Sequence, residues 1–166
     1  MGGSFGGYLA LCGAAFEPDL YRCAVTISGV FDWGRVMDEA RQDNYFDSVR
    51  YGFFRRHLGD PRKDPAKFDA ISPLRHIDKV KIPIFVFHGW DDGVASIAES
   101  KALVAALDAQ GIPNETHFLE REGHGLSQFD DAVEIYGDIA AFLEKHIGPA
   151  ASAGGGGPVS AAVAAR

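Results

Sequence analysis

Hydrophobic and polar residues alternate along the chain in blocks that predict strands and helices in turn. Two apolar runs rich in β-branched and aromatic residues, and a third with partial alternation, predict buried strands at residues 23–30, 84–87 and 115–119. Helical spacing predicts helices over 98–109 and 128–146. The apolar face expected for the last helix consists of Ala132, Ile135, Tyr136, Ile139, Phe142 and Leu143.

Residues 33–70 interrupt this order with interleaved aromatic and charged side chains. The pattern predicts two or three short helices, with a turn at residues 59–61 and with Arg55 and Arg56 in solvent. The aromatic spacing is typical of packing, although a segment inserted between two sheet strands also suits the wall of a substrate pocket.

Taken together, the elements predict the back half of an open parallel α/β sheet with helices on both faces. We expect residues 1–148 to form one domain. Residues 149–166 contain almost only Ala, Gly, Ser, Pro and Val, so we expect a disordered tail there.

Composition narrows the function without fixing it. The chain has 166 residues, 46% of them hydrophobic, and a formal net charge of −7. The acidic balance argues against a nucleic-acid partner, and no apolar run is long enough to cross a membrane. Cys12 and Cys23 lie in apolar runs and are expected to be buried thiols. No metal or cofactor fingerprint is visible, so we expect no cofactor.

The first residues carry the strongest chemical signal. Residues 2–8 read GGSFGGY, which contains the G-x-S-x-G pattern of a nucleophile elbow around Ser4. Gly2 and Gly6 would leave room for a strand and a helix to pass closely, and small apolar residues at 8–15 suit a buried helix. The alternative interpretation is a flexible glycine-rich N-terminus.

Two further residue types complete the order Ser, Asp, His that α/β-hydrolases use. Asp91 or Asp92 follows the predicted strand at 84–87, and His124, between two glycines, follows the strand at 115–119. Loops at the carboxyl ends of parallel strands meet at one edge of a sheet, so these groups can converge on Ser4. His88 directly follows its strand and is expected to shape the turn.

With these motifs the chain resembles the catalytic domain of the prolyl oligopeptidase family of serine peptidases, which includes dipeptidyl and acylaminoacyl peptidases. The resemblance spans about residues 2–147. It is carried by GGSFGGY at 2–8, Ser72-Pro73, the H-G-x-x-D-x-V motif at 88–94 and Gly123-His124-Gly125.

The resemblance implies a nucleophile at Ser4, a general base at His124 and an orienting acid at Asp92, with Asp91 as the alternative. It also implies that the backbone N–H of Phe5 is an oxyanion-hole donor. The family's second donor, its central strands and its β-propeller domain precede the elbow, where this sequence has only Met1. We therefore expect a partial α/β-hydrolase fold whose partner is the N-terminal part of the same protein.

Three functions remain open at this stage. The first is a serine peptidase that cleaves short peptides through an acyl-enzyme, and the second is a carboxylesterase with the same residues. The third is a catalytically silent fragment.

Overall fold

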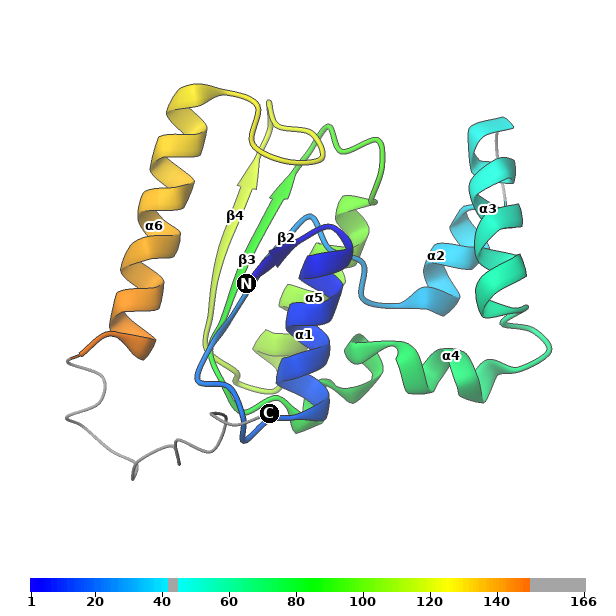
Figure 1. The fold of residues 1–166 in the computed structure, drawn as a ribbon, viewed down its shortest axis with the longest axis horizontal. Coiled ribbons are helices and arrows are strands. Elements are labelled where there is room, and N and C mark those ends of the chain that lie inside the picture. The colour runs from blue at the N-terminus through cyan, green and yellow to red at the C-terminus, as the bar shows by residue number, and fades with distance from the viewer. Residues whose placement is uncertain (42–44, 150–166) are drawn as a thin grey trace, which may run out of the picture.

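A four-stranded parallel sheet forms the centre of the protein, seen here in a computed structural model that describes residues 1–41 and 45–149. The strands stand in the order β1-β2-β3-β4, and every neighbouring pair is parallel. The sheet is covered by helices on both faces, as predicted (Figure 1). The strands are β1 (Gly2–Gly3), β2 (Ala24–Ile27), β3 (Ile84–Gly89) and β4 (Asn114–Leu119).

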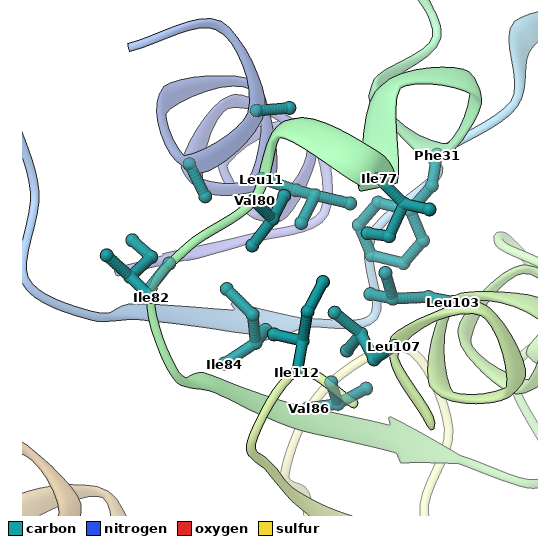
Figure 2. Close-up of a cluster of buried hydrophobic side chains, with 13 residues drawn as sticks. Leu11, Phe31, Ile77, Val80, Ile82, Ile84, Val86, Leu103, Leu107 and Ile112 are labelled. Carbon is teal, nitrogen blue, oxygen red and sulfur yellow. The ribbon is translucent and has the colours of Figure 1, made fainter. Parts of the chain in front are cut away.

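One face of the sheet is covered by α1 (Phe5–Phe16) and α5 (Ile97–Ala109), with α1 in front of α5 in the view of Figure 1. Leu11 of α1 and Leu103 and Leu107 of α5 are fully buried against Ile84 and Val86 of β3. Figure 2 shows these side chains converging, with η1 (Pro73–Lys79) closing the cluster through Ile77. This packing fixes the helix that begins at Ser4 on the sheet.

The opposite face is covered by α6 (Phe129–Ile147), on the far side from α1 and α5 in Figure 1. Ile135, Ile139 and Phe142 pack on Phe85 and Phe87 in a second cluster. Helical spacing placed Tyr136 on this face, and that prediction was wrong because the side chain is 53% exposed. The buried residues of α6 are Ile135, Ile139 and Phe142, so the sheet covers a narrower stripe of the helix than the sequence pattern predicts.

Three helices between β2 and β3 form a lobe beside the sheet (Figure 1): α2 (Trp33–Glu39), α3 (Tyr45–Leu58) and α4 (Pro65–Ile71). Asp32 and Asp64 cap α2 and α4 by accepting hydrogen bonds from Arg35 N–H and Lys67 N–H. With 14 residues, α3 is longer than the short helices predicted. The Trp33 and Phe54 rings meet edge to face at 5.1 Å, so aromatic packing holds α2 and α3 together.

Two smaller predictions need correction. Both cysteines are free thiols, as expected, but they are half-buried rather than buried.

β2 ends at Ile27, three residues before its predicted end, because Ser28 takes a left-handed φ of 48° that turns the chain out of the strand. The disordered tail was predicted for residues 149–166, and residues 150–166 lie outside the part of the chain that the structure describes.

Candidate active site

Ser4 lies on a sharp turn between β1 and α1. Its φ of 54° and ψ of −121° belong to a region that residues with a side chain rarely occupy. The Ser4 N–H donates to the Ile27 carbonyl at 2.8 Å, which ties the turn to the end of β2. The side chain makes no capping bond to the helix it precedes, so the hydroxyl is available for other partners.

Close backbone approach explains two of the glycines around Ser4. A Cβ on Gly2 would lie 2.3 Å from the Gly6 carbonyl oxygen, and a Cβ on Gly7 would lie 2.7 Å from Thr26 Oγ1. The prediction for Gly6 itself was wrong, because a Cβ there would meet nothing within 4 Å. The crowded positions are therefore Gly2 and Gly7.

His124 reaches the serine from the loop after β4. Its Nε2 lies 2.8 Å from Ser4 Oγ, and its Nδ1 lies 2.8 Å from Asp92 Oδ2. Since a carboxylate only accepts hydrogen bonds, Nδ1 carries the proton and Nε2 accepts from the Ser4 hydroxyl. Gly125 follows with a φ of +141°, which lets the loop turn immediately after the histidine.

Asp92, not Asp91, is the carboxylate beside His124. Its side chain is buried, and its Oδ1 accepts from the Val94 and Ala95 N–H groups at 2.8 Å each. Burial by itself would raise the pKa of Asp92, but the hydrogen bonds from Ala95, His124 and Val94 outweigh it and hold that pKa below its ordinary value. Asp91 is exposed, and its backbone N–H donates to the Glu122 carbonyl at 3.0 Å.

Two buried glutamates that the sequence analysis did not single out shape the loops of the site. Glu122 accepts hydrogen bonds from the N–H and hydroxyl of Ser127 and from the Gln128 N–H, so it closes the loop that carries His124. Burial would raise the pKa of Glu122, but these bonds lower it overall. The residues that flank Glu122 in the sequence do not distinguish it from Glu120.

Glu99, in the first turn of α5, organises the loop after β2. It accepts from the Phe31 and Asp32 N–H groups at 2.6 and 2.9 Å and pairs with Arg35 at 2.6 Å. Its position four residues before Leu103 on the buried face of α5 was the available sequence signal, because a carboxylate on such a face requires partners.

A mainly apolar cavity of about 180 Å³ opens beside Ser4. The cavity lies between the turn that carries Ser4, the loop after β3 and the helical lobe, so residues of the inserted segment form part of its wall. Arg50 borders it and donates a hydrogen bond to the Val94 carbonyl. The other residues around the cavity are Ser4, Phe5, Val30, Trp33, Val36, Phe54, Val94, Ala95 and His124.

Among residues 1–41 and 45–149, no three His, Cys, Asp or Glu side chains are grouped so that they could hold a metal ion. Over the same residues, no helix is both long and apolar enough to cross a membrane.

A parallel α/β sheet with a strained serine between a strand and a helix is the arrangement of an α/β-hydrolase. The chain belongs to the prolyl oligopeptidase family, whose model matches residues 1–150. It is 30% identical over 152 residues to dipeptidyl aminopeptidase BIII of Pseudoxanthomonas mexicana, covering 89% of this chain and 21% of that protein. Against the acylamino-acid-releasing enzyme of Arabidopsis thaliana it is 24% identical over 147 residues, covering 88% and 19%.

Solved structures agree on the fold. A puromycin-hydrolyzing peptidase of Mycobacterium tuberculosis superposes with a TM-score of 0.78 at 24% identity, covering 89% of this chain and 21% of that one. An acylaminoacyl peptidase of Pyrococcus horikoshii gives a TM-score of 0.76 at 20% identity, covering 87% and 23%. The chain thus spans about a fifth of the length of the relatives it matches.

Proposed function

We propose that Ser4, His124 and Asp92 form a catalytic triad that cleaves short peptides through an acyl-enzyme, and that residues 1–148 are the catalytic domain. The observation that carries this proposal is the unbroken line of hydrogen bonds from Asp92 Oδ2 through both ring nitrogens of His124 to Ser4 Oγ, at 2.8 Å for each step. Membership of a peptidase family supports the same chemistry.

In the first half of the reaction, Ser4 Oγ attacks the substrate carbonyl while its proton passes to His124 Nε2. Asp92 holds the imidazole in the required orientation and stabilises the imidazolium that forms. The tetrahedral intermediate collapses when His124 returns the proton to the leaving amine, which departs and leaves an ester on Ser4. Water then attacks that ester as His124 takes its proton. The second tetrahedral intermediate collapses by breaking the bond to Ser4 Oγ, which receives the proton from His124 as the carboxylic acid product leaves.

The negative oxygen of the intermediate needs hydrogen-bond donors. Phe5 is the first residue of α1, and the first N–H groups of a helix have no partner within the helix. We assign the Phe5 N–H as one donor, aided by the positive end of the helix dipole. Removal of a single donor of this kind costs about 10²–10³-fold in turnover, so the completeness of the hole controls how fast the chain works.

The cavity beside Ser4 gives the substrate its orientation. Its walls are mainly apolar, and they include the Trp33 and Phe54 rings next to the nucleophile. An apolar side chain on the acyl side of the scissile bond would lose its contact with water there. We therefore propose a short peptide with an apolar residue at that position as the substrate.

We also propose that the catalytic domain works within a longer polypeptide, since its relatives are about five times as long. Exposed apolar side chains of Met1, Leu9 and Tyr21 border a groove of about 300 Å³ beside β1, where further chain of such a protein would pack. The genomic DNA before Met1 tests this point. An in-register reading frame that codes for further strands supports it, and an in-register stop codon contradicts it.

Turnover of a peptidyl anilide, compared with that of a short acyl ester and with the Ser4→Ala variant as control, tests the activity. Cleavage of the anilide that disappears in Ser4→Ala supports a peptidase. Cleavage of the ester alone would instead indicate a carboxylesterase, and cleavage of neither would indicate a catalytically silent domain.

A further inference from the structure

We propose that His88 is a positioning residue for the acid of the triad, which it holds through a neutral imidazole protonated on Nε2. This inference rests on the proposed function. It assigns to His88 a part in the reaction that goes beyond shaping the turn after β3.

The contacts of His88 join the turn to the triad. The side chain is fully buried near the end of β3, and its Nε2 lies 3.0 Å from Asp92 Oδ2 and 3.0 Å from the Ala95 carbonyl oxygen. On the other side of the ring, Nδ1 lies 2.7 Å from Ser100 Oγ, which is fully buried in α5. A bond to the Ala95 carbonyl alone would be enough to shape the turn, so the contact with Asp92 needs a separate explanation.

The partners of the ring determine where its proton lies. Both groups near Nε2 are oxygen acceptors, so an unprotonated Nε2 would point its lone pair at two oxygens, whereas one N–H bonds to the Ala95 carbonyl and can be shared with Asp92 Oδ2. Nδ1 then accepts a hydrogen bond from the Ser100 hydroxyl, which can rotate to donate. Burial lowers the pKa of His88 and outweighs the opposing effects of Ala95 and Asp92, so the ring is neutral.

Asp92 is consequently held on every side. Oδ2 lies 3.0 Å from His88 Nε2 and 2.8 Å from His124 Nδ1, and Oδ1 accepts hydrogen bonds from the N–H groups of Val94 and Ala95. A carboxylate fixed in this way cannot rotate away from His124 during the reaction. A line of close polar contacts therefore runs from Ser100 through His88, Asp92 and His124 to Ser4.

The tautomer can be measured without any enzymatic activity. Long-range ¹H–¹⁵N correlation NMR of the full chain distinguishes an imidazole protonated on Nε2 from one protonated on Nδ1 or on both. We expect His88 to be protonated on Nε2 alone near neutral pH. Protonation on Nδ1, or on both nitrogens, would overturn the inference whatever the chain catalyses.

Rates of labelling by a fluorophosphonate probe test the consequence at Ser4. His88→Met removes the donor and should lower the inactivation rate constant on the order of 10- to 100-fold at unchanged probe affinity, because a small misplacement of the acid is costly. His88→Gln can restore an N–H to Asp92 and should recover most of that rate. Val86→Ala, a buried change on the same strand away from Asp92, controls for loss of stability.

The possible outcomes separate the inference from the proposed function. An unmodified chain that is not labelled at Ser4 would defeat the proposed function, while the tautomer would still decide the role of His88. If the unmodified chain is labelled at Ser4 and a folded His88→Met variant is labelled equally fast, only the role of His88 is overturned.

Discussion

Ser4 Oγ lies 2.8 Å from His124 Nε2, although 120 residues separate them along the chain. Their strands, β1 and β4, are at opposite edges of the sheet, with β2 and β3 between them. Because all four strands are parallel, the turn after β1 and the loop after β4 leave the sheet at the same edge. The two side chains meet there, above the end of β3, where Asp92 completes the line.

Replacing each of the two neighbouring aspartates by asparagine in turn tests which of them orients His124. Asp92→Asn should lower kcat about 10⁴-fold, because an amide cannot stabilise the imidazolium, and His124→Ala should lower it further, to about 10⁶-fold. Asp91→Asn should leave kcat unchanged, since the side chain is exposed and the substitution keeps the backbone N–H that donates to the Glu122 carbonyl. The opposite result for the two aspartates would reverse the assignment of the acid.

Two adjacent glycines in α1 should respond differently to the same substitution. Gly7→Ala forces a methyl group against Thr26 Oγ1 and should lower the free energy of unfolding by about 1–3 kcal/mol. Gly6→Ala meets open space and should raise that free energy by up to about 1 kcal/mol, because alanine favours a helix over glycine. Urea denaturation of the two variants provides the comparison. Equal destabilisation by the two substitutions would contradict the close approach of α1 to β2 at Gly7 alone.

Glu122 should matter for catalysis without touching the substrate. In Glu122→Gln, an amide NH₂ replaces one of the oxygens that accept from Ser127 and Gln128, so the loop carrying His124 loses part of its support. We expect a lower melting temperature and turnover reduced on the order of 10- to 100-fold. Glu120→Gln, an exposed change in the same segment, is the matched control and should alter neither quantity.

The depressed pKa of Asp92 gives stability a defined pH dependence. Its folded-state pKa lies below the ordinary value of 3.8, so the native state binds fewer protons than the unfolded state. The resulting stabilisation is complete above about pH 4 and is lost as the pH falls through the folded pKa. Below pH 4, the unfolding free energy of the unmodified chain should therefore decline more steeply than that of Asp92→Asn. Parallel curves would exclude a depressed pKa.

Several features of the fold followed from the sequence because they depend on local patterns. The apolar runs predicted β2 and β3, and helical spacing placed α5 to within one residue of its observed bounds. Ser4 and His124 were recognisable because each lies among glycines where a tight turn or an open loop is needed. The choice between Asp91 and Asp92 depended on the resemblance to the family, since both follow the same strand.

The remaining features depend on partners that have no sequence signature. Glu99 and Glu122 are buried against backbone N–H groups of distant or turning segments, and any residue except proline can supply such a group. Gly7 rather than Gly6 is crowded because of Thr26 on the neighbouring strand, so the contact exists only once the sheet is formed. Tyr136 was misplaced because periodicity shows which helix face is apolar and does not show how much of it the sheet covers.

Covalent labelling of Ser4 tests the central claim most directly. The full chain, treated with a fluorophosphonate probe and analysed by peptide mass spectrometry, should carry the phosphonate on Ser4, with labelling abolished in Ser4→Ala and strongly slowed in His124→Ala. A folded chain that remains unlabelled, or one labelled equally fast with and without His124, would contradict an activated serine at this site.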